Sequence, residues 1–500
     1  MCTVLLQSCR ELPSPHDLMS KSDDSKILDV RIKLQIVCCC LIQEIIIQSD
    51  RTDVWLPIIQ EHLVLSTLLS SMEVYIKSRQ ALCCVHAAFL LLLTIAKNEK
   101  GAESVVMSGL VQHTCLSVMY LYQKETDFFP KILSSNKLKE PLTSTEEKCQ
   151  WHTVLCVCLD LYSIVLRLLK YSFLEDALNF VGAHQDRMQE CLERSRITMT
   201  DAAMLESEKT CSFINLLSRF NRIWRLHLGE SLIKLQTSML YMSQTLIAFL
   251  MRPRYLQQVL EQQSGQSNRP KLSVSPKLQQ QTSTEDIDKP SSQLIHIQHR
   301  MLEVLAHSLS SLKNFTPDLC EILYEQSMDC SEFEPFLALG FSGPSPDQDS
   351  IPSFGTFTSC IRDVCVKLLM KQEVKSPHKN SEDSNTEIIP KSLINYVLEN
   401  ALYIVMSQAT RYLRDPHLPS SEKQLLKREL GTEMNYFLME LQRYLRRGTP
   451  SSPSAAKSPR PSLSATTPLL GRSLSQTTFA ATPETEFFKF VQEFVLQVLK

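Results

Sequence analysis

The residues of this sequence that could hold a metal ion are few and scattered. His296 and His299 lie three positions apart, a spacing that lets two imidazoles on one helix share a metal. No Cys, Asp or Glu that would complete the ligand set is evident on the same face, so we interpret the pair as a surface feature. Cys156 and Cys158 lie two apart, which directs them to different faces of a helix. The sequence predicts no metal and no cofactor.

Motifs of phosphate-binding, dinucleotide-binding, serine-hydrolase and zinc-protease sites (GxxxxGK[ST], GxGxxG, GxSxG and HExxH) do not occur in the sequence. Several of these motifs use glycine to reach a positive φ angle, and the chain has only 11 glycines in 500 residues. We therefore predict no enzyme activity, no catalytic residue and no small-molecule substrate.

Serine and threonine residues that precede proline are candidate phosphorylation sites. Ser376 lies in Ser-Pro-His-Lys, which supplies the basic residue that cell-cycle kinases favour. A phosphate adds about −1.5 to −2 charge, enough to reverse the charge of a weakly basic segment. A Ser/Pro-rich linker contains such pairs by composition alone, so both interpretations stay open. The candidates are Ser376, Thr449, Ser452, Ser458, Thr467 and Thr482.

Apolar residues recur every three or four positions through most of the chain. One set is Leu232, Leu235, Met239, Met242 and Leu246, and such spacing places an apolar stripe on one side of a helix. Thr316 followed by Pro317 predicts a helix start. The predicted helices are 27–48, 54–71, 72–97, 101–123, 146–171, 172–195, 208–225, 230–251, 254–263, 291–313, 317–328, 357–373, 391–414, 420–446 and 485–499.

Helices of this length with short connections predict an all-α fold, an α-solenoid of irregular HEAT- or armadillo-like antiparallel helix pairs with disordered loops. Segments rich in Ser, Pro and Gln interrupt the helical pattern, because they cannot bury enough apolar surface to offset their ordering entropy. The predicted organisation is a flexible N-terminus (1–20), a helical array (21–263), a disordered loop (264–290), the array continued (291–447), a disordered insert within it (374–390), a Ser/Thr/Pro-rich linker (448–483) and a C-terminal amphipathic helix (484–500).

Composition places the chain among large proteins with reduced thiols. It is 43% hydrophobic with a net charge of −2, which gives no general attraction to nucleic acid or to an anionic membrane. The 17 cysteines lack CxxC spacing, and we predict buried thiols, as in the run Cys38-Cys39-Cys40. The apolar stretch 81–96 carries no Asp, Glu, Lys or Arg and is shorter than the ~20 residues of a membrane span, so we predict a buried helix there.

The C-terminal helix is the best candidate for a docking element. Phe487, Phe490, Phe494 and Val498 form a stripe at i, i+3, i+7 and i+11. The alternative is that this helix packs on the last repeats and caps the array.

The stretches 28–47, 208–250 and 467–500 resemble the C-terminal region of the large inner-ring scaffold nucleoporins of the nucleoporin 188/205 family. The likeness extends through essentially the whole chain and contains no diagnostic motif. It implies a non-catalytic scaffold of the nuclear pore complex at the nuclear envelope. Its implied partners are other nucleoporins, in particular the inner-ring linker nucleoporin of the 93-kDa class, and its implied role is support of protein import and RNA export. The family chains are far longer than this one.

Two other functions stay open at the level of sequence. The first is a transport-receptor-like or regulatory α-solenoid that binds cargo or a small GTPase reversibly. Such a receptor needs acidic runs for basic cargo signals, and the longest here are pairs such as Asp23-Asp24, which favours the scaffold. The second is a helical accessory subunit of an enzyme.

Overall fold

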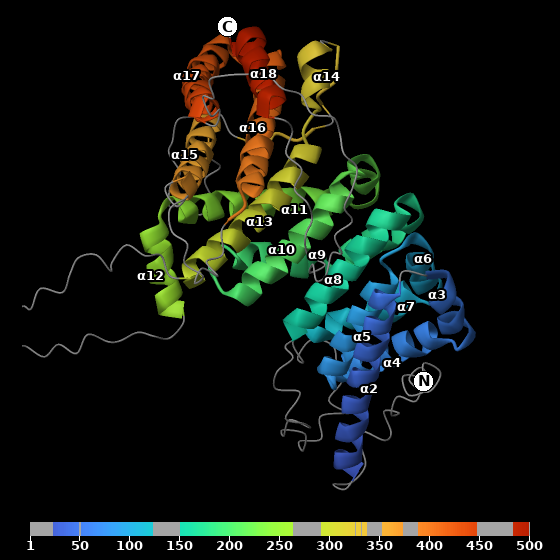
Figure 1. The fold of residues 1–500 in the computed structure, drawn as a ribbon. Coiled ribbons are helices and arrows are strands. Elements are labelled where there is room, and N and C mark those ends of the chain that lie inside the picture. The colour runs from blue at the N-terminus through green and yellow to red at the C-terminus, as the bar shows by residue number, and fades with distance from the viewer. Residues whose placement is uncertain are drawn as a thin grey trace, which may run out of the picture. The chain divides into compact units, whose positions relative to one another are not determined.

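The computed structural model describes residues 24–49, 52–123, 151–263, 292–325, 327–331, 333–337, 353–373, 389–447 and 484–499. These residues fall into two compact units. Unit 1 contains 24–242 together with 259–263, and unit 2 contains 243–258 together with the described residues from 292 onwards. Every regular element in the described ranges is a helix (Figure 1), so the predicted all-α class is confirmed.

Within the described residues, unit 1 contains residues 259–263 of α12 (Pro253–Gln263), together with ten other helices or parts of helices and one 3₁₀ turn. They are α2 (Asp24–Gln48), α3 (Thr52–Glu61), α4 (Val64–Ser78), α5 (Leu82–Ile95), α6 (Glu99–Met107), α7 (Leu110–Thr114), η2 (Ser117–Leu121), α8 (Trp151–Leu169), α9 (Tyr171–Arg194), α10 (Asp201–Ser218) and α11 (Asn221–Met251) as far as Met242.

The helices of unit 1 pack in a row, in which α2 contacts α5, α5 contacts α8 and α8 contacts α10 (Figure 1). The remaining helices cover this row: α4 packs on α5, and α6 and α9 pack on α8. Each helix alone would leave an apolar stripe in water, and its neighbours remove that stripe from solvent. This is the side-by-side packing predicted for an α-solenoid.

Unit 2 repeats this kind of packing. Here α13 and α15 contact α16, and α17 contacts both α15 and α18. Its elements are the end of α11, the start of α12 (Pro253–Gln263), α13 (Ser292–Asn314), α14 (Leu319–Tyr324), α15 (Phe354–Glu373), α16 (Lys391–Arg414), α17 (Ser420–Arg447), α18 (Glu484–Phe494) and the π-helical turn η4 (Val495–Leu499).

Several predicted helix boundaries are wrong, mostly because the backbone turns at residues that carry no turn signal. The predicted break at 71/72 lies inside α4, and the chain breaks at Leu63 and Arg79, whose φ angles are 50° and 54°. The predicted helix 101–123 is divided at Gly109, which has a φ of 98°. The predicted helix 208–225 is divided between α10 and α11.

The predicted start at Thr316-Pro317 is also corrected by the structure. The Thr316 hydroxyl donates to the Lys313 carbonyl oxygen (2.7 Å) at the end of α13. The cap of α14 is Asp318, whose carboxylate accepts from the backbone N–H groups of Cys320 (2.9 Å) and Glu321 (3.2 Å).

The prediction of buried thiols holds for most of the described cysteines but fails for Cys40 and Cys320, which are exposed. Cys38 and Cys39 are buried against α5. Successive helix positions differ by about 100°, so three consecutive side chains cannot all face the same neighbour.

Among the described residues, α8 is long and apolar enough to cross a membrane, and so is the bent pair formed by α6 and by α7 with η2, if it is counted as one span. In this fold α8 is the central helix of unit 1 and is buried on most sides by α5, α6, α9 and α10. Its apolar composition is therefore explained by its place in the core.

Candidate docking surfaces

The predicted C-terminal stripe packs within unit 2. Phe494 is fully buried, while Phe487, Phe490 and Val498 are half-buried. The helix α18 lies on α17, and its Glu493 accepts a hydrogen bond from the hydroxyl of Tyr324 on α14. This arrangement supports the capping alternative. Docking of a partner by these four residues stays a prediction.

The six predicted phosphorylation sites lie outside the described residues, as do the predicted flexible segments 1–20, 264–290 and 448–483. Their use therefore stays a prediction. The two histidines of the possible metal site lie on α13, where His299 Nε2 is 3.8 Å from a carboxylate oxygen of Glu303. Within the described ranges, no three His, Cys, Asp or Glu side chains converge as metal ligands do.

A hollow of about 650 Å³ lies between α15 and α17, in a part of the chain for which the sequence predicted no site. One side carries small and polar residues of α15, and the other carries longer side chains of α17. The lining residues are Gly355, Thr356, Ser359, Cys360, Leu425, Arg428, Glu429, Thr432 and Glu433.

Glu429 of α17 lies at one end of this hollow, where it caps the N-terminus of α15. Its Oε1 accepts from the backbone N–H of Gly355 (3.1 Å) and from the hydroxyl of Ser353 (3.2 Å). A carboxylate at a helix N-terminus satisfies free N–H groups and interacts favourably with the helix dipole. Burial nevertheless raises the pKa of Glu429. The contact requires glycine at 355, because a Cβ there would lie 2.2 Å from Oε1.

Arg362 holds α15 and α17 together beside the hollow. Its guanidinium donates to Glu433 (2.7 Å) and to Asp363 (2.9 Å), and it lies over the ring of Tyr436 at 4.5 Å. The exposed large apolar residues of α17 are Leu425, which lines the hollow, Tyr436, which lies beside Arg362, and Met439. The surface therefore combines apolar side chains with charges that are already paired.

Cys360 and Ser359 are two potential nucleophiles of this surface. Cys360 is its one thiol, and burial raises the pKa of Cys360, which keeps it in the less nucleophilic protonated form. The Ser359 hydroxyl accepts from the Arg362 guanidinium (3.2 Å), and no histidine is among the lining residues.

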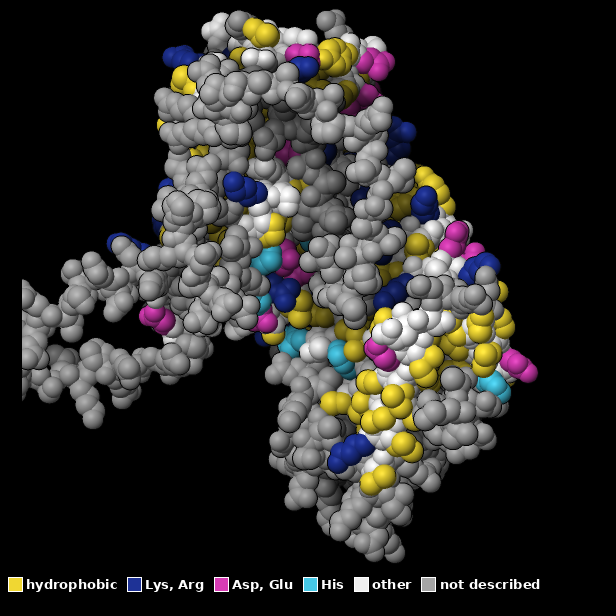
Figure 2. All heavy atoms as spheres, in the orientation of Figure 1, with side chains coloured by type: hydrophobic (Ala, Val, Ile, Leu, Met, Phe, Trp, Pro, Cys, Tyr) yellow, Lys and Arg dark blue, Asp and Glu magenta, His cyan; other side chains and the backbone are white. Residues whose placement is uncertain are grey.

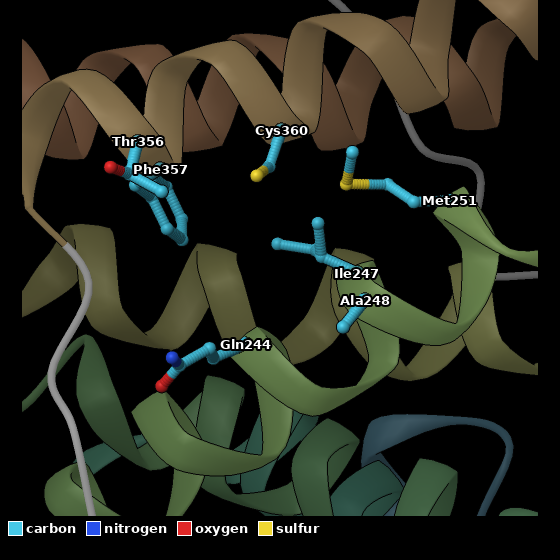
Figure 3. A pocket seen from close by; sticks show the side chains of 7 residues that line it. All are labelled: Gln244, Ile247, Ala248, Met251, Thr356, Phe357 and Cys360. Atoms are coloured by element: carbon cyan, nitrogen blue, oxygen red, sulfur yellow. The ribbon is translucent and has the colours of Figure 1, made fainter. Parts of the chain in front are cut away.

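A second cavity of unit 2, between the end of α11 and α15, is too small for a ligand. Figure 3 shows Ile247 and Met251 of α11 facing Phe357 and Cys360 of α15. The accessible space is about 20 Å³, roughly the room of one water molecule. Its lining is almost entirely apolar, so we interpret it as a packing gap.

Unit 1 contains a buried polar network that sequence analysis did not find. Arg187 of α9 and Glu206 of α10 are both buried and form a two-point ion pair. Glu206 also accepts from His152 Nδ1 (3.0 Å), and the Arg187 guanidinium lies 4.9 Å from the centre of the Trp151 ring. Burial alone would raise the pKa of Glu206, but the hydrogen bond from His152 and the charge of Arg187 outweigh it and lower the pKa.

A hydrogen-bonded histidine adjoins this network. His184 Nε2 is 2.7 Å from the carbonyl oxygen of Cys115, so Nε2 carries the proton. Nδ1 then accepts from the hydroxyl of Tyr122 (2.6 Å). Burial lowers the pKa of His184 to about 4. The partners are 62 and 69 residues away along the chain, and the available sequence signal is that His184 falls on the apolar stripe of α9.

Comparison with known proteins finds relatives from several vertebrates that carry the same name. The chain is 32% identical to human "Nucleoporin NUP188" over 471 residues, which is 91% of this chain and 26% of the relative. It is 32% identical to the mouse protein of the same name over 92% of the chain, and 31% identical to that of Xenopus tropicalis over 83% of the chain. The chain spans about a quarter of the length of the curated relatives it matches. No protein-family model matches it.

Proposed function

We propose, from the premise that this chain belongs to the NUP188 family of nucleoporins, that it acts as a non-catalytic structural part of the inner ring of the nuclear pore complex at the nuclear envelope. The observation that carries the proposal is the likeness to NUP188 over about nine-tenths of the chain, together with packing in which helices bury one another's apolar stripes. In this role the chain supports protein import and RNA export by holding other nucleoporins in place.

The partner that fits this role is another nucleoporin that binds through a helical segment. We propose that this partner is the linker nucleoporin of the 93-kDa class. The hollow between α15 and α17 is the proposed seat. Leu425, Tyr436 and Met439 would cover an apolar stripe of the segment. The charge of Arg428, which lines the hollow, would determine the position at which the segment binds along the surface.

Phosphorylation of the Ser/Thr-Pro sites would weaken such assembly. Segment 448–483 carries Lys457, Arg460 and Arg472 and no acidic residue. Five phosphates, each adding about −1.5 to −2 charge, would make it strongly acidic, so its contacts with an acidic surface would be lost. Replacement of Thr449, Ser452, Ser458, Thr467 and Thr482 by Glu is expected to lower partner affinity, and unchanged affinity contradicts this part of the proposal.

The experiment for the scaffold function is purification of the tagged chain from interphase cells, with quantification of co-purified proteins. Inner-ring nucleoporins at stoichiometric levels are the expected result. A single partner released by salt or by guanine nucleotide would instead support the transport-receptor-like alternative. The variant Tyr436→Glu/Met439→Glu is expected to lose the linker nucleoporin, whereas Leu226→Glu, at an exposed position of unit 1, keeps it. If both variants retain the linker nucleoporin, the hollow between α15 and α17 is not its binding site.

A further inference from the structure

Basic residues gather at two connections between helices of unit 1, the one from α8 to α9 and the one from α10 to α11. Tyr171, the first residue of α9, and Phe220, directly before α11, pack edge to face with their ring centroids 5.0 Å apart. The two connections therefore lie next to each other. Figure 2 shows Lys and Arg side chains next to hydrophobic ones in the part of unit 1 that Figure 1 colours teal and green. The basic residues, which we call the basic turn cluster, are Arg167, Lys170, Arg219, Arg222 and Arg225.

The positive charge of the basic turn cluster faces solvent. Four of its members are exposed, and Arg225 is half-buried. Within the part of the chain that the structure describes, none of the five forms an ion pair. The acidic residues nearest along the chain lie outside the connections: Glu175 and Asp176 are in the second turn of α9, and Glu230 follows the break in α11 at Leu228.

Stabilisation of the helix ends explains only part of this cluster. A cation is favourable at the C-terminal end of a helix and unfavourable at its N-terminal end. Arg167, in the last turn of α8, and Arg219, directly after α10, follow this rule. Lys170, Arg222 and Arg225 lie at the starts of α9 and α11, where neither first turn contains an acidic residue. Cations that the helices do not favour indicate an anionic partner.

Two exposed apolar side chains lie among these charges. The exposed fraction is 71% for Tyr171 and 86% for Leu226. Leu226 lies four positions after Arg222, and this spacing puts both on the same side of α11. Basic side chains that attract lipid headgroups, next to Leu and Tyr side chains that enter the interface, are the two components of peripheral membrane binding. A nucleic acid would use the cations and the Tyr171 ring, whereas Leu226 gains most from contact with acyl chains.

We propose that the basic turn cluster, together with Tyr171 and Leu226, binds the surface of an anionic phospholipid membrane. The net charge of −2 gives the whole chain no general attraction to such a membrane. Charges farther away than a Debye length of about 8 Å are largely screened, however, so the local cluster determines the attraction. The inference takes from the proposed function only the location at the nuclear envelope, where a membrane is within reach, and it requires no nucleoporin partner.

The test is co-sedimentation of the full chain with vesicles of phosphatidylcholine and phosphatidylserine in a ratio of about 3:1, compared with vesicles of phosphatidylcholine alone. The wild type is expected to bind the anionic vesicles only. It should be released in about 1 M NaCl, where the Debye length falls to about 3 Å. Each basic residue near an anionic leaflet contributes a factor of about five to the affinity, so Arg222→Glu/Arg225→Glu should lower it about twentyfold or more.

Matched variants separate the cluster from the overall charge. Lys97→Glu/Arg194→Glu makes the same change of charge at exposed residues, and Arg194 lies at the opposite end of the 24-residue helix α9 from Lys170. This variant should bind as the wild type does. Leu226→Ser should lower the affinity about fivefold without a change of charge. Met107→Ser, at a position that is also 86% exposed, should have no effect. Circular dichroism shows whether each variant is folded.

Three results would overturn the proposal. The folded wild type could bind neutral and anionic vesicles equally, or bind neither. Binding could persist in the folded Arg222→Glu/Arg225→Glu variant. Finally, the chain could ignore vesicles but bind single-stranded RNA, with loss of RNA binding in the same variant, which would make the cluster a nucleic-acid contact. Because the assay contains only this chain and lipid, its failure leaves the co-purification test of the scaffold function unaffected.

Discussion

The guanidinium of Arg187 donates to both carboxylate oxygens of Glu206, at 2.6 and 2.7 Å from Nη2 and 2.8 Å from Nε, inside the core between α9 and α10. Both side chains are almost completely buried. A buried ion pair contributes little net stability compared with a well-packed apolar pair, but breaking it leaves an uncompensated charge in a medium of low dielectric constant. The pair is therefore a contact between α9 and α10 that is costly to break.

Removal of one member should be much more harmful than removal of both. Arg187→Met is expected to lower the free energy of unfolding by about 3–5 kcal/mol, because Glu206 loses its main counter-charge. Arg187→Met/Glu206→Met should recover most of that loss. Urea unfolding of the wild type, Arg187→Met, Glu206→Met and the double variant measures the coupling. Losses that simply add would show that the pair is not coupled as its geometry indicates.

Stability should decrease as the pH falls below 7. Folded His184 stays neutral because burial lowers its pKa to about 4, whereas in the unfolded chain it protonates near pH 6.5. The unfolded state then binds more protons than the folded state. This residue alone should therefore lower the free energy of unfolding by about 2 kcal/mol between pH 7 and pH 5. Burial also lowers the pKa of His86, which adds a smaller slope of the same sign.

The control for this pH dependence is His184→Gln, studied by urea unfolding at several pH values. The variant should lose most of the decline, although it is less stable at pH 7. Glu206 should not interfere in this window because its pKa is lowered and it stays ionised. The same slope in the wild type and the variant would assign the pH dependence to other groups.

Two substitutions of glycine residues in helices should change the stability of the protein in opposite directions. In Gly101→Ala the new Cβ would lie 1.9 Å from the carbonyl oxygen of Ile95, so α6 must move away from the end of α5. In Gly431→Ala nothing lies within 4 Å of the new Cβ. We expect Gly431→Ala to stabilise α17 by about 0.5–1 kcal/mol. Gly101→Ala should destabilise unit 1 by about 2 kcal/mol or more. Thermal melting of both variants tests this, and stabilisation by Gly101→Ala would mean that α6 is not so close to α5.

Replacement of Lys170 by glycine should stabilise the protein. Lys170 joins α8 to α9 with a φ of 50° and a ψ of −117°, a conformation that costs a residue with a Cβ about 1–3 kcal/mol. Lys170→Gly is expected to raise the free energy of unfolding by about 1 kcal/mol, while Lys170→Ala should give no gain. Equal effects of the two substitutions would show that the benefit comes from loss of charge.

Helix content was predictable from the residues because each helix repeats apolar positions locally. The stripe of Leu232, Leu235 and Met239 is buried as its spacing predicts. Breaks without a local signal were not predictable: Leu63 and Arg79 adopt left-handed backbone conformations, although neither is a residue type that favours them. Their conformation depends on how α3, α4 and α5 pack.

The sequence by itself determined that the chain is all-helical and belongs with the NUP188 nucleoporins, since both follow from patterns within short stretches and along the whole chain. Only the tertiary structure decided which apolar faces are covered. The stripe of α18 that the sequence singled out has Phe494 buried, whereas the stripe of α2 is covered on one face and exposed on the other. Periodicity shows that a helix face is apolar, but burial depends on neighbours that lie far away along the chain.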